Sequence, residues 1–438
     1  MKIRRTLSAL LVPALLVLAA AVPGPAHGSL QIEITSGVRD PIPIAIVPFA
    51  PAAPADGGLD VAGVVQHDLE GSGRFKALPR ERMPAQPTRA EAVATGDWKG
   101  AGSDYVVVGR VSSDNGTLAV DFDLINTLTG TRLATQRFTG PASALRNAAH
   151  RVSDAIYQKI LGVRGAFATR IAYVAVDGTA PAQHYQLIVA DADGENAHLI
   201  LDSRFPIMSP AWSPDGQWLA YVSFESKLSG VYVQLVRSGE RRLVSARAGI
   251  NGAPAWSPDG RKLALTLGGS NGNPDIYVLD LASQGLTRIT DDPAIDTEPE
   301  WSPDGRSLYF TSDRAGSPQI YQISSGGGGR PRRITFEGNY NARPRVSADG
   351  TQLAMVTLDN GNYRIAVQDL ASGAVRVLSH GHLDESPSFA PNGASVIYSQ
   401  REGGRGALAT VSVDGLTGLR LKAQQGTVGD PAWGPFGT

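Results

Sequence analysis

The chain of 438 residues contains no cysteine. Disulfide bonds, thiolate nucleophiles and cysteine-ligated metal sites are therefore excluded. It also lacks an excess of charge of either sign, because 40 lysines and arginines nearly balance 41 acidic residues and leave a net charge of −1. Such a balance provides no excess of positive charge that would attract nucleic acid or an anionic membrane, so no nucleic-acid partner is expected. Beyond the first 28 residues no apolar run approaches the ~20 residues that a spanning helix needs, so we expect no membrane insertion.

Glycine and proline, in contrast, are abundant, with 50 and 29 residues. No low-complexity tract accounts for them, so many tight turns do, as in an all-β architecture. Hydrophobic residues make up 42% of the chain and charged residues 18%, which are ordinary values for a folded protein. A core of useful size can therefore form without disulfides or metals.

The N-terminus has the order of an export signal. Lys2, Arg4 and Arg5 form a basic start, residues 7–22 are an apolar run, and small residues follow up to Gly28. This order predicts a cleavable signal peptide, residues 1–28, and an exported mature chain. A retained membrane anchor is the alternative, but the run is short for a spanning helix.

A heptapeptide, Pro-Ala-Trp-Ser-Pro-Asp-Gly at 210–216, recurs through the second half of the chain. Its six copies, three of them degraded, have their central residue at Trp212, Trp256, Trp301, Val346, Phe389 and Trp433. The spacing of 43 to 45 residues is typical of a four-stranded propeller blade. Ser-Pro-Asp-Gly suits a tight hairpin, because proline presets the second position of the turn and glycine accepts a left-handed fourth position.

The two ends of the repeat array complement one another. Residues 171–174 look like a second strand without a motif before them, and the last motif, at Pro431, has no strands after it. Joining the ends completes a sixth blade and removes the exposed edges of the ring. Residues 166–438 are therefore predicted to form an all-β six-bladed propeller whose ring is closed by the C-terminal strand.

Residues 29–165 contain no repeat and mix strand and helix patterns. Strands are expected at 30–35, 43–49, 105–109, 118–124 and 132–135, and helices at 59–69 and 142–161. The whole chain is thus predicted to have two domains, a small N-terminal α/β domain and the propeller, with a linker at 162–169.

Two glycine-rich segments have patterns of catalytic or phosphate-binding loops. Ser270 lies in a G-x-S-x-G sequence, but a hydrolase nucleophile needs a strand–turn–helix, and this segment lies between two blade strands. Residues 326–329 are four glycines with no lysine of a phosphate loop after them. Both are interpreted as loops, so we predict no catalytic residue and no cofactor.

Two other segments have residues that could bind metal ions. His380 and His382 are close in sequence to acidic residues, and Asp191-Ala-Asp193-Gly194 resembles the start of a calcium loop. The first lacks a second histidine cluster, and the second lacks the later ligands and the closing glutamate. They are interpreted as an exposed blade loop and a β-turn, and no metal site is predicted; a cation in the propeller channel stays open.

The repeated blades, the preceding α/β domain and the signal together resemble the TolB family, the periplasmic components of the Tol–Pal system, over essentially the whole mature chain. The most specific stretches are Ile34–Val38, Pro43–Phe49, Gly165–Tyr173, Met208–Gly216, Asn251–Pro254, Thr297–Pro299 and Leu383–Pro387. The resemblance implies a monomeric, non-enzymatic scaffold that links the inner-membrane TolA complex to the outer-membrane lipoprotein Pal. It further implies a role in outer-membrane integrity and constriction during cell division.

The resemblance also implies two binding sites. The start of the mature chain would contact TolA, through Leu30, Gln31, Ile32, Glu33, Ile34, Thr35, Ser36, Gly37, Val38, Arg39 and Asp40. Loops before the blade motifs would line a mouth that binds Pal, through Met208, Ser209, Asn251, Gly252, Ala253, Thr297, Glu298, Asp384 and Glu385. Ile250 departs from the family pattern, which has a histidine there.

Two rival functions stay open at this point. One is a propeller enzyme with catalytic side chains in the channel, and the other is a sensor that binds a small ligand or glycan in the pore. An enzyme needs His, Glu or Arg at the ends of the inner strands, whereas the motif strands offer mostly Pro, Ala, Trp and Ser. The composition of these strands therefore favours the scaffold.

Overall fold

The computed structural model describes residues 40–51, 58–179, 181–268, 273–421 and 426–437. The predicted signal peptide and the predicted strand at 30–35 lie outside these residues. All described residues belong to one compact unit that spans residues 32–438. No helix among them is long and apolar enough to cross a membrane.

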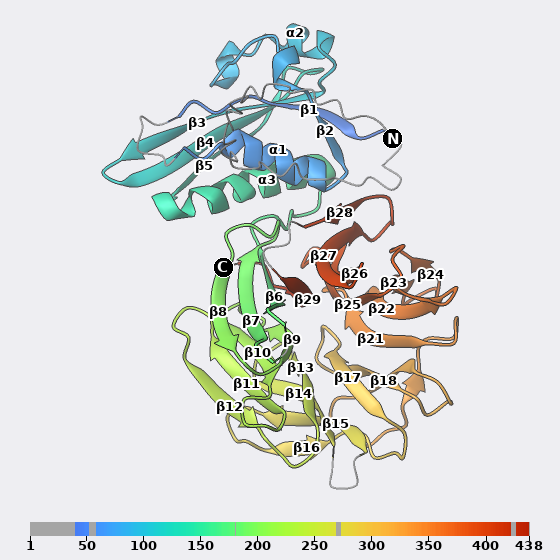
Figure 1. The fold of residues 1–438 in the computed structure, drawn as a ribbon. Helices are drawn as coiled ribbons and strands as arrows, with labels where there is room; N and C mark the ends of the chain where they lie inside the picture. Colours follow the sequence, from blue (N-terminus) through green and yellow to red (C-terminus); the bar gives the residue numbers. More distant parts are fainter. Residues whose placement is uncertain (1–39, 52–57, 180, 269–272, 422–425, 438) are drawn as a thin grey trace, which may run out of the picture. The chain divides into compact units, whose positions relative to one another are not determined.

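The N-terminal domain is built on a sheet whose described strands have the order β2-β1-β3-β4-β5 (Figure 1). The strands are β1 (Ile42–Ile46), β2 (Phe75–Ala77), β3 (Tyr105–Asp114), β4 (Thr117–Asn126) and β5 (Arg132–Pro141). The helices are α1 (Val61–Gly71), α2 (Thr95–Gly100) and α3 (Leu145–Leu161), with short 3-10 turns at 80–82, 90–92 and 142–144. The predicted α/β class is confirmed.

Strand β1 is buried on both of its faces. It runs parallel to β2 and to β3, with Ile44 opposite Tyr105 in the register of β3. Ile44 and Ile46 pack against helices α1 and α3, while Ala45 packs with Trp98 of α2 on the other face. A strand covered on both faces reads as a continuous apolar run, which is why the sequence indicated it clearly.

Several boundaries differ from the predicted ones. Strands β3, β4 and β5 are each ten residues long. Strands β3 and β4 pair along their full length because Asn115 and Gly116, both with positive φ, form the hairpin turn between them. Strand β2 and helix α2 were not predicted, since three and six residues are too short to show a period. Helix α3 begins at Leu145, after the 3-10 turn, and ends at Gly162 in a left-handed conformation.

Across the described residues the second domain consists of six four-stranded antiparallel sheets. Blade 1 contains β29 (Thr427–Trp433), β6 (Arg170–Asp177), β7 (His184–Asp191) and β8 (His198–Ser203), and blade 2 contains β9 (Ile207–Trp212), β10 (Trp218–Ser223), β11 (Gly230–Leu235) and β12 (Arg241–Ser245). Blade 3 contains β13 (Asn251–Trp256), β14 (Lys262–Gly268), β15 (Pro274–Asp280) and β16 (Leu286–Arg288), and blade 4 contains β17 (Asp296–Trp301), β18 (Ser307–Ser312), β19 (Gln319–Ser324) and β20 (Arg332–Arg333). Blade 5 contains β21 (Asn341–Val346), β22 (Gln352–Asp359), β23 (Asn362–Asp369) and β24 (Val375–Val377), and blade 6 contains β25 (Asp384–Phe389), β26 (Ser395–Glu402), β27 (Arg405–Ser412) and β28 (Gly418–Arg420).

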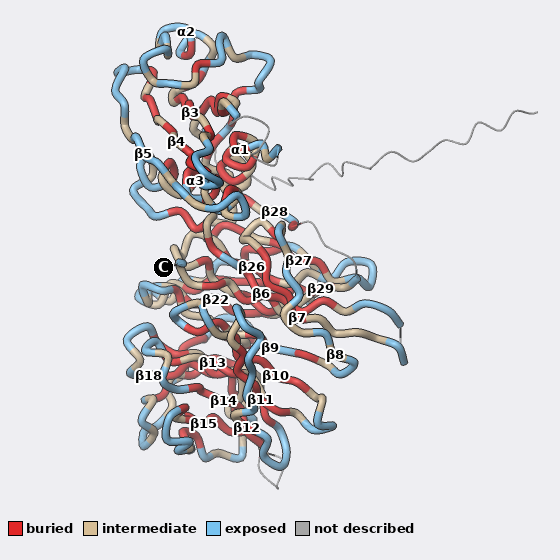
Figure 2. The backbone as a smooth tube through the Cα atoms, turned by 90° about the vertical axis from the view of Figure 1, so that its left-hand side faces the viewer, coloured by how far each residue is buried: buried red, intermediate tan, exposed pale blue. Residues whose placement is uncertain are grey.

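The ring closes as predicted, because the last strand joins the first blade. Strand β29 pairs antiparallel with β6, with Trp433 opposite Ile171, and Figure 1 shows the two ends of the propeller sequence side by side. Figure 2 shows that strands such as β6, β10 and β14 are buried along most of their length, while the connecting loops are exposed. The six-bladed propeller is therefore confirmed.

The turns of the motif are held by their own side chains. In the first copy the amide of Gly216 donates to the carbonyl of Ser213 at 2.9 Å, and Gly216 has φ 65°. The Ser213 hydroxyl donates to Asp215 at 2.5 Å and accepts from the Trp218 amide at 2.9 Å. The same bonds recur in the copies that begin at Ser257, Ser302 and Ser347, so the tight hairpin is confirmed.

The motif tryptophans join neighbouring blades. The indole N–H of Trp301 donates to the carbonyl of Ala255 in the preceding blade at 3.1 Å, and Trp256 donates to Ala211 at 3.2 Å. Across the closure of the ring, Trp212 donates to Ala432 at 3.1 Å. The two copies with Val346 and Phe389 at this position have no indole donor, and other polar contacts cross these joints, such as that between Arg343 and Glu298.

The linker between the domains is tied to α3 by Asp154. Its carboxylate accepts from the amides of Phe167 at 2.8 Å and Ala168 at 3.3 Å. Gly165 lies so close that a Cβ there would be 2.7 Å from the Cα of Asp154. Burial raises the pKa of Asp154 to about 6, although the two amides act in the opposite direction.

The blade joint predicts the effect of Trp301→Phe. The substitution keeps an aromatic ring but leaves the buried carbonyl of Ala255 without its donor, so the free energy of unfolding should fall by about 1–3 kcal/mol. Urea denaturation measures it. Trp218→Phe is the matched control, because the indole of Trp218 makes no hydrogen bond among the described residues. An equal loss in both variants would contradict the role of the indole bond.

The raised pKa of Asp154 predicts a pH dependence of stability. Because the folded pKa of about 6 exceeds the ordinary pKa of 3.8, this group stabilises the fold most below pH 4, and the contribution disappears as the pH rises through 6. The free energy of unfolding of the wild type, minus that of Asp154→Asn, should therefore fall by about 1 kcal/mol from pH 5 to pH 7.5. Urea denaturation at the two pH values tests this, and a difference independent of pH would contradict it.

Candidate functional site

One strained backbone position repeats around the wall of the propeller channel. In each innermost strand the residue just before the motif proline has a positive φ, between 45° and 57°. These residues, called the channel ring below, are Ser209, Ala253, Glu298, Arg343, Ser386 and Asp430. At each one the register of the innermost strand shifts by a bulge. Bulges of this kind change the direction of a side chain and are frequent at functional sites.

Arg343 connects several members of the channel ring. Its Nε lies 2.9 Å from an oxygen of Glu298, and its Nη1 lies 3.4 Å from an oxygen of Asp430. The same nitrogen hydrogen-bonds the hydroxyl of Ser386, which in turn donates to Asp430 at 2.7 Å. Burial opposes the charge of Arg343, but the carboxylates outweigh it and raise its pKa. Blades 1, 4, 5 and 6 are thus linked across the channel.

Arg343 and Asp430 were not among the residues predicted from the sequence. Both precede a proline of a motif copy, in the same position as Glu298, which was predicted. The signal was available, since aligning the six copies places all three residues in one column. The residue at this position differs from copy to copy, and the partners of the ion pair lie in different copies, so no single copy indicates the pair.

The predicted Pal-binding residues divide into two groups. Met208 is 41% exposed, and Ser209, Gly252, Ala253, Thr297, Glu298 and Glu385 are half-buried along the innermost strands. Asn251 and Asp384 are instead 1% and 0% exposed. The structure thus brings the first group to the channel wall but turns the side chains of the second group inward.

Asn251 and Asp384 are the first residues of their strands and hold the loops before them. The Asn251 side chain accepts from the Ser245 hydroxyl at 2.7 Å and the Arg247 amide at 2.9 Å. Asp384 accepts from the Gly381 amide at 2.9 Å. These two residues shape the loops and offer little surface to a partner.

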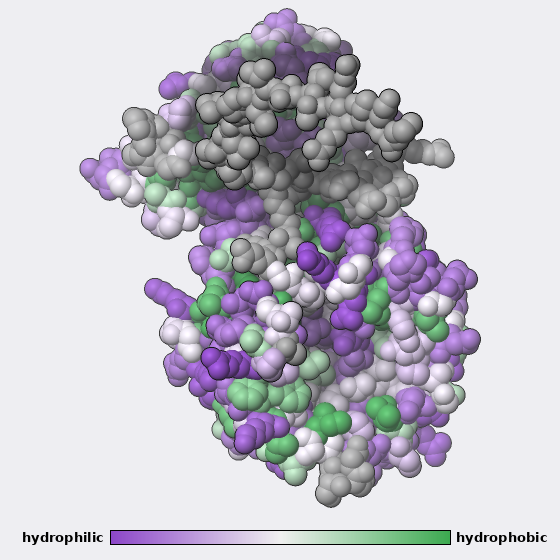
Figure 3. Space-filling model, viewed as in Figure 1, coloured by the Kyte–Doolittle hydropathy of each residue, from purple (hydrophilic) through white to green (hydrophobic). Residues whose placement is uncertain are grey.

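Exposed large hydrophobic residues recur in the loops that lead into the innermost strands. Figure 3 shows hydrophobic residues dispersed among hydrophilic ones over the face in view, so exposure alone means little. Their positions mean more, because before or at the start of β9, β13, β17 and β21 one or two large apolar side chains are 41–73% exposed. These residues, called the mouth residues below, are Phe205, Met208, Ile250, Ile295 and Phe336. Four successive blades therefore present apolar side chains at one end of the propeller.

The N-terminal domain contacts the loops at the other end. Strand direction alternates within a blade, so the loops before β26 and before β28 lie opposite the mouth residues. Arg74 pairs with Asp414 at 2.6 Å, and the side chain of Asn392 donates to the carbonyl of Arg164 at 3.0 Å. Within the described residues no contact of the N-terminal domain with a mouth residue is found. The mouth is thus left uncovered by that domain.

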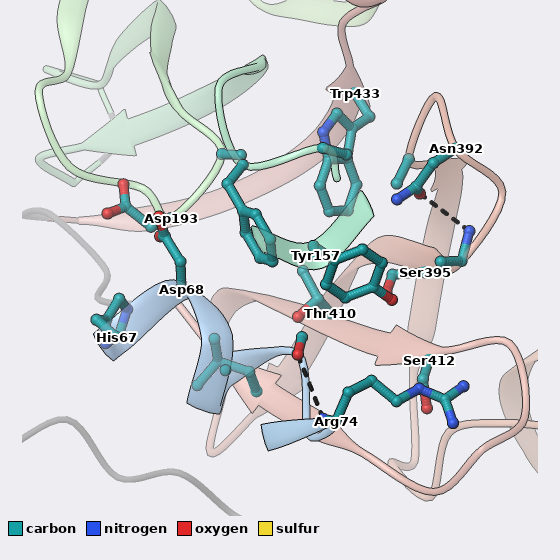
Figure 4. A pocket seen from close by; sticks show the side chains of 18 of the residues that line it. His67, Asp68, Arg74, Tyr157, Asp193, Asn392, Ser395, Thr410, Ser412 and Trp433 are labelled. Carbon is teal, nitrogen blue, oxygen red and sulfur yellow. Dashed lines mark hydrogen bonds between the residues drawn. The ribbon is translucent and has the colours of Figure 1, made fainter. Parts of the chain in front are cut away.

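A cavity of about 90 Å³ lies where the N-terminal domain meets the propeller. Figure 4 shows Tyr157 and Trp433 on its wall, with Arg74 at one side and Asp68 next to Asp193 at the other. Most of the wall is apolar. Asp68 and Asp193 form its acidic end.

The other segments with chemical motifs have ordinary roles. Ser270 lies outside the described residues. Residues 326–329 form a turn, and the Nδ1 of His382 lies 2.9 Å from the side-chain oxygen of Asn362. Within the described ranges the metal-ligand group that forms is Asp68, His150 and Asp193, and it includes neither His380 nor His382.

Comparison with known families gives two matches that together cover most of the chain. Residues 30–133 match the family described as "TolB amino-terminal domain", and residues 157–437 match "TolB beta propeller domain". The boundary between the matches falls in the region of α3, which the structure places in the N-terminal domain.

Curated relatives and a solved structure agree with these matches. "Tol-Pal system protein TolB" of Xanthomonas campestris pv. campestris is 48% identical over 416 residues, which cover 93% of this chain and 94% of the relative. The protein of the same name from Xanthomonas oryzae pv. oryzae has the same identity and coverage. The crystal structure of TolB from Acinetobacter baumannii superposes with a TM-score of 0.86 at 42% identity, and covers 93% of this chain and all of that one.

The channel ring predicts that Arg343→Gln destabilises the propeller. Two carboxylates would lose their cation in a partly buried place, so the free energy of unfolding should fall by about 1–3 kcal/mol, as measured in urea. Arg241→Gln is the control, because Arg241 is similarly exposed (34% against 31%) and has one carboxylate partner, Glu225, at 2.9 Å. The control should lose about half as much, and a larger loss there would contradict the account.

Proposed function

The chain belongs to the TolB family of the Tol–Pal system, and on that premise we propose that it is a periplasmic, non-enzymatic scaffold that binds Pal and TolA. In this role it connects the outer-membrane lipoprotein Pal with the inner-membrane TolA complex. It thereby contributes to outer-membrane integrity and to constriction of the outer membrane during cell division.

The observation that carries the proposal is the repeated exposure of large apolar side chains at the mouth. Phe205, Met208, Ile250 and Ile295 come from three successive blades and are each 41–49% exposed. Protein interfaces depend on a few buried apolar or aromatic anchors surrounded by polar groups. Met208 shares a groove with Arg343 and Asp430 of the channel ring, which supply such polar groups.

Within the mouth we propose different roles for the predicted Pal-binding residues. Direct contact is proposed for Met208, Ser209, Gly252, Ala253, Thr297, Glu298 and Glu385, which are exposed or half-buried. Asn251 and Asp384 act indirectly, because their hydrogen bonds fix the loops that carry the contacts. Ile250 adds an apolar contact where the family pattern has a polar one.

The TolA site is proposed for the start of the mature chain, residues 30–40. Of these only Asp40, an exposed residue, lies within the described residues. The alternating pattern of residues 30–35 suits an extended segment that adds to the edge of a partner sheet. If Pal bound at the mouth alters how this segment docks on its own chain, the two sites are coupled, and the coupling is reciprocal.

An enzyme in the channel is the weaker alternative. The charged groups of the channel ring are paired with one another, since Arg343 contacts Glu298 and Asp430. A general acid or base needs to face its substrate with an altered pKa, and a salt-bridged group is a poor candidate. The pairing therefore supports a structural role for these charges.

The mouth proposal predicts that Ile250→Asp weakens Pal binding at least tenfold. A charge at this position would have to lose its water when an apolar partner surface covers it. Titration calorimetry with purified Pal measures the affinity. Leu243→Asp is the matched control, because Leu243 is 47% exposed on the outer strand β12, away from the mouth, and should bind as the wild type does. An unchanged affinity for Ile250→Asp, or an equal loss in the control, would contradict the mouth site.

The division between the two sites predicts the effect of deleting residues 30–40. The deletion should abolish capture of TolA and leave capture of Pal from an envelope extract intact, because the mouth residues lie in the propeller. Circular dichroism provides the control for folding. Loss of both partners from a folded variant would refute the separation of the sites.

A further inference from the structure

His150, on helix α3, is a buried side chain held in a fixed orientation. It is 1% exposed, and its Nδ1 lies 2.8 Å from an oxygen of Asp68. The hydroxyl of Ser153 donates to the same oxygen at 2.6 Å. A carboxylate beside Nδ1 keeps the proton on that nitrogen, so the lone pair of Nε2 points away from Asp68.

The Nε2 atom of His150 faces two further carboxylates. It lies 3.8 Å from Oδ2 of Asp191 and 3.9 Å from Oδ2 of Asp193, too far for hydrogen bonds. Among the described residues neither this Nε2 nor Oδ2 of Asp191 has a hydrogen-bond partner. Buried polar atoms rarely lack a hydrogen-bond partner. A lone pair that faces two carboxylate oxygens is repelled by them unless a positive charge lies between the three atoms.

The charges around this point do not balance. Asp68, Asp191 and Asp193 carry three negative charges. The cation beside them is Arg146, which pairs with Asp193 and lies 3.4 Å from Asp191. Arg170 also acts on Asp191. It is held by the carbonyl of Gly216 at 2.9 Å, so it does not enter the cluster. With a neutral imidazole the cluster retains an excess of negative charge. Burial acts to lower the pKa of His150, but Asp68, Asp193 and Asp191 outweigh it and raise that pKa, so a positive charge at the imidazole is favoured.

The two distances from Nε2, 3.8 Å and 3.9 Å, lie close to those between two ligands of one metal ion. Bonds of about 2.1 Å from a zinc ion to a histidine nitrogen and to a carboxylate oxygen place the two ligand atoms roughly 3.4–3.8 Å apart, depending on the angle. One imidazole and two carboxylates suit zinc better than calcium or magnesium, which prefer oxygen ligands alone. We propose that His150, Asp191 and Asp193 bind one zinc-like divalent ion, and that Asp68 positions the imidazole.

The turn that supplies the two carboxylates belongs to blade 1. The amide of Gly194 donates to the carbonyl of Asp191 at 2.9 Å, and the Glu195 amide donates to Asp193 at 3.0 Å, which confirms the β-turn predicted from the sequence. The segment lacks a third ligand of its own, and the structure supplies one from α3, more than forty residues earlier. The ion would therefore connect the N-terminal domain to the propeller, next to the cavity shown in Figure 4.

The experiment uses the purified chain without a histidine tag, stripped with a chelator and titrated with Zn²⁺ by calorimetry. We expect one site with a dissociation constant below about 10 μM and a melting temperature that rises with Zn²⁺, since a ligand of the folded state stabilises it. His150→Gln and Asp191→Asn should each weaken binding at least tenfold. His67→Gln, on α1 at the cavity wall but outside the cluster, should bind as the wild type does.

A second readout does not depend on the variants. Co²⁺ bound in place of Zn²⁺ should give a visible absorption band in the wild type, and Ca²⁺ in tenfold excess should leave that band unchanged. Absence of a one-to-one isotherm and of a Co²⁺ band in the wild type would overturn the proposal. Binding that survives both His150→Gln and Asp191→Asn would also overturn it, because the ion would then bind elsewhere. Neither result would bear on Pal binding at the mouth.

Discussion

The pairing of strand β29 with β6 is the constraint on which the rest of the propeller depends. Without it, blade 1 would lack its innermost strand, and the ring would present two unpaired edges. The indole of Trp212 reinforces the same joint through its bond to Ala432 across the closure. Closure in turn fixes the six innermost strands around one channel. The mouth and the channel ring exist as surfaces because the ring is closed.

The repeated motif serves both the fold and the proposed site. Its tryptophan joins a blade to the preceding one, and its Ser-Pro-Asp-Gly turn forms a rigid hairpin at the end that faces the N-terminal domain. The residue before its first proline sits at a bulge and faces the channel, where Arg343 pairs with Glu298 and Asp430. Structural residues of the motif thus recur with little change, while the bulge position varies from copy to copy. This variation allows a symmetric fold to carry an asymmetric surface.

Much of the fold could be predicted from the sequence because its signals are local. The spacing of the motif gave the blades, and the incomplete units at its two ends gave the closure. Strand β2 and helix α2 could not be predicted, since they are too short for a period and are stabilised by tertiary packing such as that of Trp98. The burial of Asn251 could not be predicted either, because its partners are Ser245 at the end of β12 and Arg247 in the loop that follows, whose path depends on the neighbouring strands.

The candidate sites differ in the same way. Glu298 was found from a resemblance to the family, and Arg343 would have followed from an alignment of the copies. The cluster around His150 had only a partial sequence signal, the Asp191-Ala-Asp193-Gly194 segment, because the remaining ligand comes from a helix of the other domain. A site between distant segments appears when the chain is folded, and physical arguments about charge and unpaired atoms then identify it.

The central claim is that the mouth of the propeller is the surface that binds Pal. Amide hydrogen exchange of the purified chain, with and without Pal, tests it most directly. Binding at the mouth should slow exchange in the loops and strand starts at 204–209, 246–253 and 291–298, and leave the loops at 192–197 and 413–417 unchanged. Protection confined to the latter loops, at the end that contacts the N-terminal domain, would contradict the account.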